Sequence, residues 1–246
     1  MLGLGLGLGL KSNVGGFSLT DVSGLQAWYK FDTDISVSGQ GVRVRQWSDQ
    51  SGNGNHMTNT TATNKRPVYD TTFGGGAVSF EAHEGYLESA SAFGGTNEFT
   101  VFIRVSMPFD SSVTKLNPLL TGQSSNDSIA AGNLNFLTGS YYSFTGDGSN
   151  SNYAHTKSTE TTYPILNDTP LVFVVRREGT SLKFYKDSIS QVIHSGTESE
   201  TSATFDIDTL GKTSNGGVAT ILEFAFYNST VTDDEFNKII NDIKSR

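Results

Sequence analysis

The chain contains no cysteine among its 246 residues. A disulfide scaffold, a thiolate-ligated zinc or iron–sulfur site and a thiol nucleophile are therefore excluded. Charged residues make up only 17% of the chain, and Asp plus Glu (25) outnumber Lys plus Arg (17), for a net charge of -8. This acidic balance argues against a nucleic-acid partner, because such proteins usually display a basic patch.

The sequence also lacks any run of about 18 consecutive apolar residues, so it predicts no transmembrane helix and no membrane partner. Proline is scarce at 5 residues, whereas glycine reaches 27 and aromatic residues make up 11%. Aromatic and β-branched runs separated by Gly, Ser, Thr and Asn favour many strands joined by tight turns. Because all-β sandwiches often reach about 200–250 residues as one unit, the length favours a single large domain.

The N-terminus alternates Leu and Gly without exception from residue 2 to residue 10. Glycine loses more backbone entropy on ordering than any other residue, so this segment should be disordered when unbound. In an extended conformation the leucines share one face, which we predict binds a partner protein: Leu2, Leu4, Leu6, Leu8 and Leu10. Residues 1–16 are thus predicted to form an extended arm and residues 17–246 the folded domain; the alternative is a tail lying on its own sheet.

Apolar runs, alternating or continuous, predict the strands of the folded domain. They occur at residues 25–31, 42–47, 99–107, 171–175, 181–186 and 221–227. The third of these runs puts alternate apolar residues on one face, whereas residues 171–175 are apolar without a break, as in a strand buried on both faces. In the last run, Leu222, Phe224 and Phe226 are predicted to share a face, and Glu223 is expected to join a buried network or face a loop.

Residues 232–235, Thr-Asp-Asp-Glu, form a capping box that predicts the start of a helix. The apolar residues that follow recur at the spacing of one helix face: Phe236, Ile239, Ile240 and Ile243. We expect this stripe to pack on the sandwich, since most helical stability comes from burying such a face, although it could instead dock a partner helix. The predicted fold class is an all-β sandwich of two antiparallel sheets with one C-terminal α-helix.

Several of these segments follow one another in a familiar order. They include the strand Leu25-Gln-Ala-Trp-Tyr-Lys-Phe-Asp32, the turn at residues 49–56, and the closing strand and helix start at residues 222–236. Together they resemble the concanavalin A-like lectin/glucanase superfamily in its laminin G-like jelly-roll form. The resemblance covers about residues 24–246 and implies the fold more than the function, because such folds host lectins, hydrolases, lyases and structural modules.

The Gly-Leu start joined to this domain resembles virion proteins of tailed phages, in which laminin G-like domains decorate heads, tails and fibres. This second resemblance implies a non-enzymatic virion structural protein, either a head or tail decoration subunit or a fibre-associated one, located in the virion. Its partners would be other virion proteins in many copies. The arm would add to an exposed sheet edge through backbone hydrogen bonds, with alternate leucines filling pockets.

The alternative function is a carbohydrate-binding, lectin-like module for host surface glycans. Such a site needs exposed aromatic side chains over a shallow groove with polar neighbours. Tyr141, Tyr142 and Tyr153 form an aromatic cluster in a loop-like region and are the candidate glycan contacts. Rim and core aromatics of a large sandwich would give the same pattern.

A polysaccharide hydrolase or lyase is the third function, and we do not expect the chain to be an enzyme. A glycoside hydrolase needs two carboxylates across the scissile bond. The E-x-D-x-x-E string that retaining glucanases of this fold carry is absent. Asp206 and Asp208 share a strand face, but we expect them to be solvated carboxylates at a strand edge.

No cofactor is expected, with calcium as the one alternative. The lectin resemblance implies it, since such relatives often bind calcium through loop Asp and Asn oxygens. Asp49, Asn53 and Asn55 offer hard oxygen ligands within one turn, but not at EF-hand spacing. Asn-Gly turns also arise for steric reasons alone, because both residues tolerate a positive φ.

Overall fold

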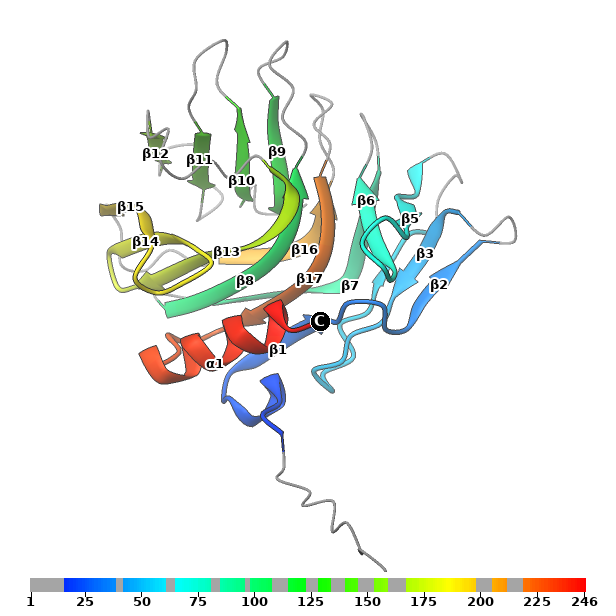
Figure 1. Ribbon diagram of the computed structural model, residues 1–246, viewed down its shortest axis with the longest axis horizontal. Helices are drawn as coiled ribbons and strands as arrows, with labels where there is room; N and C mark the ends of the chain where they lie inside the picture. Colours follow the sequence, from blue (N-terminus) through cyan, green and yellow to red (C-terminus); the bar gives the residue numbers. More distant parts are fainter. Residues whose placement is uncertain are drawn as a thin grey trace, which may run out of the picture.

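Two antiparallel sheets and one C-terminal helix make up the fold of the computed structural model (Figure 1). The structure describes residues 16–38, 42–60, 65–80, 85–95, 98–107, 115–122, 128–133, 140–145, 153–158, 167–197, 205–211 and 219–246. The predicted fold class is confirmed. The predicted arm lies outside the described residues except for Gly16, so its leucines stay a prediction.

Sheet A has eight strands in the order β15-β14-β13-β8-β17-β6-β5, with β1 also paired to β17. Their bounds are β1 (Leu25–Tyr29), β5 (Val68–Asp70), β6 (Ala77–Phe80), β8 (Glu98–Met107), β13 (Asn167–Glu178), β14 (Ser181–Lys186), β15 (Val192–Thr197) and β17 (Ala219–Tyr227). A 3-10 turn, η1 (Leu19–Asp21), precedes β1, and the helix α1 (Asp233–Lys244) follows β17.

Sheet B has nine strands in the order β12-β11-β10-β9-β16-β7-β4-β3-β2. Their bounds are β2 (Ile35–Val37), β3 (Val44–Trp47), β4 (Met57–Thr58), β7 (Tyr86–Gly95), β9 (Lys115–Thr121), β10 (Ser128–Asn133), β11 (Ser140–Thr145), β12 (Tyr153–Ser158) and β16 (Phe205–Gly211). Neighbouring strands pair antiparallel, and many neighbours are distant in the chain, such as β16 between β9 and β7.

The core lies between the two sheets and is rich in aromatic rings. Alternate residues of β8 face it, as their spacing predicts: Phe99, Val101, Ile103 and Val105. The rings of Phe99 and Phe205 stack with centroids 4.8 Å apart and join the two sheets. Trp47 is fully buried in this core.

Strand β13 is buried on both faces, as its unbroken apolar run predicts. Phe173 and Val175 face the core between the sheets. Val172 and Val174 face the other way and belong to a second apolar cluster on the outer face of sheet A. This second cluster exists because α1 covers that face.

A β-bulge in β17 changes the predicted alternation. The pairing of β17 with β8 shifts register between Ile221 and Glu223. Ile221, and not Leu222, therefore joins Phe224 and Phe226 in the core between the sheets. Leu222 is buried outside that cluster. The expectation that Leu222 shares their face is wrong, because an extra residue in a bulge reverses the side-chain alternation before it.

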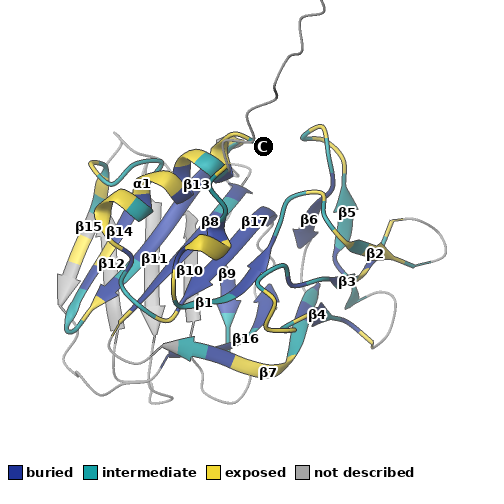
Figure 2. Cartoon of the chain, turned by 90° about the horizontal axis from the view of Figure 1, so that it is seen from below, coloured by how far each residue is buried: buried dark blue, intermediate teal, exposed yellow. Residues whose placement is uncertain are grey.

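Helix α1 begins at the predicted capping box and packs on sheet A (Figure 2). The Thr232 hydroxyl accepts the Glu235 N–H at 3.3 Å, and a Glu235 carboxylate oxygen accepts the Thr232 N–H at 2.8 Å. The predicted apolar stripe is buried against the outer cluster of sheet A: Phe236, Ile239, Ile240 and Ile243. The stripe therefore serves the fold of its own domain.

Candidate functional site

A pocket of about 370 Å³ lies on the outer face of sheet A, beside the first turn of α1. Its floor comes from the β13–β14 hairpin, where Arg176 pairs with Lys183 and Glu178 pairs with Ser181. The alternate residues of both strands face the core, so these polar residues share the opposite face. Asp233, the first residue of α1, closes one side. We call this the Arg176 pocket.

Arg176 is the most buried of the charged groups whose ion pairs shape the pocket, with only 15% of its side chain exposed. Its Nη1 donates to Oδ1 of Asp233 at 2.8 Å, and its Nη2 lies 3.9 Å from Oε2 of Glu178. Its Nε is buried and has no hydrogen-bond partner among the residues that the structure describes. The two carboxylates remain largely in water, at 73% exposed for Asp233 and 63% for Glu178.

Tyr185 forms the inner wall of the Arg176 pocket. It is only 3% exposed, and its ring meets that of Phe236 edge-on at 5.0 Å between centroids. Burial raises the pKa of Tyr185, and the neighbouring Arg176 guanidinium opposes that shift. The phenol therefore stays protonated at neutral pH and presents a hydrogen-bonding hydroxyl instead of a charge.

Two aliphatic residues complete the rim. Val192, the first residue of β15, is 45% exposed, and Ile189 packs partly on the outer apolar cluster. The pocket thus combines one guanidinium, one ammonium, two carboxylates, hydroxyls and a small apolar rim. Convergent donors and acceptors fix the orientation of a bound ligand, and they make this lining more polar than that of most small-ligand sites. It fits a polar ligand that both donates and accepts hydrogen bonds.

The tyrosines predicted to bind glycan lie elsewhere, in sheet B. Tyr141 and Tyr142 are consecutive residues of β11, and Tyr153 begins β12, where it pairs with Thr145. They therefore lie in paired strands, whereas the sequence placed them in a loop-like region. Their side chains are outside the described part of the structure, so their proposed role in glycan binding stays a prediction.

The turn predicted as a calcium site is organised by hydrogen bonds. Oδ1 of Asp49 accepts the N–H groups of Trp28 and Ser51, each at 2.9 Å, and Oδ2 accepts the Ser51 hydroxyl at 2.7 Å and the Asn55 N–H at 3.0 Å. The side-chain amides of Asn53 and Asn55 donate to backbone carbonyls of β1. Within the described ranges, no group of three or more Asp, Glu or His is placed to hold a metal ion. Calcium binding here stays a prediction.

Asp206 and Asp208 do not lie at a strand edge as expected. Their strand, β16, pairs with β9 on one side and β7 on the other, and both residues are partly buried. Oδ1 of Asp208 accepts the Thr209 hydroxyl at 2.7 Å. The expectation of a strand edge is therefore wrong, because long-range pairing put β16 inside the sheet.

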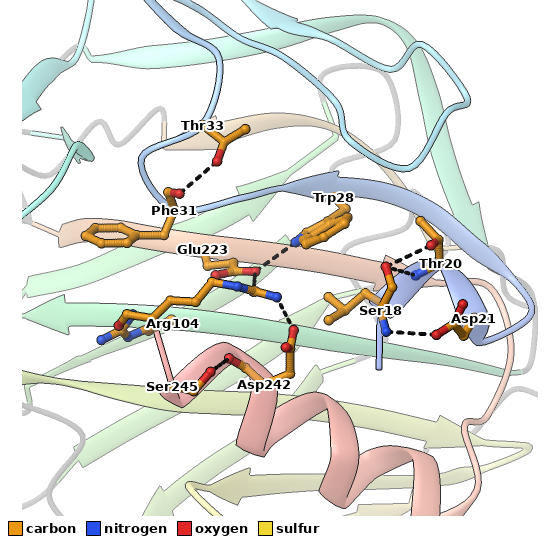
Figure 3. Close-up of polar contacts among 12 residues, drawn as sticks. Ser18, Thr20, Asp21, Trp28, Phe31, Thr33, Arg104, Glu223, Asp242 and Ser245 are labelled. Atoms are coloured by element: carbon orange, nitrogen blue, oxygen red, sulfur yellow. Dashed lines mark hydrogen bonds and ion pairs between the residues drawn. The ribbon is translucent and has the colours of Figure 1, made fainter. Parts of the chain in front are cut away.

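A second polar cluster lies where β1, β17 and the end of α1 meet (Figure 3). Glu223 is fully buried there, and its Oε1 accepts the Trp28 Nε1–H at 2.8 Å. Arg246 forms ion pairs with Glu223 and Asp242, and Arg104 donates to the Arg246 carbonyl at 2.6 Å. Burial raises the pKa of Glu223, while Arg246 and Trp28 oppose that shift. Glu223 thus joins a buried network, one of the two places expected for it.

The hairpin residues of the Arg176 pocket are predictable from the sequence. The strands at residues 171–175 and 181–186 predict a hairpin, and alternation then puts Arg176 on the same face as Lys183 and Tyr185. Nothing local indicates that Asp233 reaches them, since it is 57 residues from Arg176. The placement of α1 across sheet A decides that contact.

Comparison with solved structures gives neighbours with the same arrangement of sheets. The binding domain of Paraclostridial Mosquitocidal Protein 1 matches with a TM-score of 0.58 at 12% identity, over 92% of this chain and 53% of that chain. Botulinum neurotoxin type C, whose cell entry depends on two ganglioside molecules, matches with a TM-score of 0.58 at 11% identity, over 92% and 52%. The chain shares the fold of these domains, a β-sandwich of two antiparallel sheets.

A GH54 α-L-arabinofuranosidase also matches, with a TM-score of 0.56 at 15% identity, over 82% of this chain and 50% of that chain. The chain spans about half the length of these solved chains, and identities this low establish the fold alone. No protein-family model and no curated protein matches the sequence. In the described ranges, no helix has the length and apolar character needed to cross a membrane.

Proposed function

We propose that this chain is a non-catalytic, lectin-like binding module that recognises surface glycans through the Arg176 pocket. The observation that carries the proposal is the pocket itself, where Arg176, held at 15% exposure, faces hydroxyl, ammonium and carboxylate groups. A glycan hydroxyl both donates and accepts, so it can use these groups together. The neighbours named as binding domains add support through their shared fold.

A glycan array with purified protein tests the proposal. Arg176→Ala and Lys183→Ala each remove a charged donor from the pocket, and we expect either to weaken binding about 10- to 100-fold. Lys238→Ala is the matched control, because Lys238 is an exposed cation on α1 that does not line the pocket. A silent array at high protein concentration, or equal loss in all three variants, would contradict the proposal.

The same array examines the sheet B tyrosines. If Tyr141→Ala or Tyr142→Ala abolishes binding while Arg176→Ala leaves it unchanged, the glycan site lies on β11 and not at the Arg176 pocket.

Absence of catalysis is checked by incubating bound glycans with the protein and analysing them by mass spectrometry. Released sugars would indicate a hydrolase or lyase.

The second candidate is attachment to a virion through the N-terminal arm, and the alternating Leu-Gly repeat of residues 2–10 favours it. Burying five leucines would contribute roughly 10 kcal/mol at about 2 kcal/mol each, and ordering the backbone would oppose a similar amount. Such an arm would bind weakly alone and depend on many copies. Deleting residues 2–10 should prevent incorporation into the particle; unchanged incorporation would exclude this role.

A further inference from the structure

We infer that the Arg176 pocket selects uncharged sugars with two adjacent hydroxyl groups and rejects acidic sugars. The inference rests on the proposed function and adds the chemical class of the ligand. Three observations carry it: the gap between Arg176 and Glu178, the pairing of both carboxylates with one guanidinium, and the balance of charge in the lining.

The gap accommodates a hydroxyl group. Nη2 of Arg176 and Oε2 of Glu178 are 3.9 Å apart, beyond the range of a direct hydrogen bond. A hydroxyl placed between them accepts a hydrogen bond from Nη2 and donates one to Oε2, as a bridging water does. A carboxylate or sulfate oxygen cannot fill this position, because it has no proton to donate to Glu178.

The second carboxylate, that of Asp233, accepts a hydrogen bond from a second sugar hydroxyl. Asp233 pairs with Nη1 of the same guanidinium at 2.8 Å and is 73% exposed, so it retains lone pairs that face water. Glu178 and Asp233 thus both lie beside the same guanidinium group. Each of two neighbouring sugar hydroxyls then has one carboxylate to donate to, and hydrogen bonds to charged groups are the stronger kind.

Charge explains the rejection of acidic sugars. Arg176 and Lys183 are balanced by Glu178 and Asp233, so the lining has no excess positive charge for an anion. An anionic group beside Arg176 would also lie within a few ångströms of both carboxylates, where like charges repel. Repulsion of this kind gives specificity without adding affinity for the preferred ligand. Exposed Val192 offers the apolar contact that the C–H face of a sugar needs.

A glycan array containing neutral, sialylated, uronic and sulfated glycans separates the two proposals. We expect neutral glycans with adjacent hydroxyls to bind at least about tenfold more tightly than acidic ones. Binding restricted to acidic glycans, or equal binding of both classes, would overturn the inference and leave the proposed function standing. Silence across the array would overturn both.

A specificity switch provides the sharper test. Glu178→Gln combined with Asp233→Asn removes both carboxylates while keeping side-chain shape, and leaves Arg176 and Lys183 unbalanced. We expect neutral glycans to bind about tenfold more weakly and acidic glycans about tenfold more tightly. Asp234→Asn is the matched control, since Asp234 is the exposed next residue of the same helix turn and does not line the pocket.

Circular dichroism and thermal melting establish that the double variant is folded before its affinity is read. A double variant that melts like the wild type but gains no acidic-glycan binding would overturn the rejection mechanism. If Asp233→Asn and Asp234→Asn alter neutral-glycan binding equally, the role of Asp233 in the pocket is wrong. Should the double variant fail to fold, Glu178→Gln alone, which changes β13 and leaves the helix sequence intact, is expected to show the same trend.

Discussion

Trp28 donates its indole N–H to the Glu223 carboxylate at 2.8 Å, although 195 residues separate the two in sequence. The contact joins β1 to β17 and buries the carboxylate completely. Arg246 supplies the compensating charge, and it also pairs with Asp242 on α1. One buried acid thus connects the first strand, the closing strand and the end of the helix.

Removing Arg246 should destabilise the fold, because it leaves a buried carboxylate without its cation. We expect Arg246→Ala to lower the free energy of unfolding by about 2–4 kcal/mol in urea titration. Lys244→Ala is the control: its ion pair with Asp187 is partly exposed at 3.6 Å and should contribute less than about 1 kcal/mol. Equal effects of the two variants would contradict a special role for Arg246.

The raised pKa of Glu223 predicts a specific dependence of stability on pH. An acid whose folded-state pKa lies above its ordinary value of 4.5 stabilises the fold below that pH. The contribution is lost as the pH rises through the folded-state pKa. Glu223→Gln removes this loss, so the stability of the variant relative to wild type should increase with pH above 4.5. A constant difference in unfolding free energy between about pH 4 and pH 8 would contradict the prediction.

The capping box of α1 should contribute measurably to stability. Thr232→Ala removes the hydroxyl that accepts the Glu235 N–H, and we expect a loss of about 1 kcal/mol by chemical denaturation. The Thr232 N–H that Glu235 accepts lowers the pKa of that carboxyl, so its contribution is lost as the pH falls through the lowered pKa. Asn237→Ala, at an exposed position within the helix, should cost nothing comparable.

Two glycines with positive φ should respond differently to an added methyl group. At Gly211, with φ of 78°, a Cβ would meet the Phe80 ring and lie 2.7 Å from the Gly85 carbonyl oxygen. At Gly52, with φ of 91°, it would meet nothing within 4 Å. Gly52→Ala should cost about 1–2 kcal/mol from backbone strain alone, and Gly211→Ala about 1–3 kcal/mol more. Similar melting temperatures for both variants would contradict the predicted crowding around Gly211.

The elements built from local patterns were predictable. The alternation at residues 99–107 and the capping box at residues 232–235 depend only on neighbours a few residues apart, and both are confirmed. The face of Leu222 was not predictable, because the bulge depends on how β17 registers with β8. The same holds for Asp206 and Asp208, whose surroundings depend on which strands flank β16.

The sequence by itself determined a two-sheet antiparallel sandwich, its helix and the two strands that flank Arg176, because hydrophobic periodicity and capping are local properties. Only the tertiary structure decided that Asp233 reaches Arg176 and that Arg246 reaches Glu223. Both contacts follow from laying α1 across sheet A. That placement depends on the combined shape of two apolar faces, which no single segment of the chain encodes.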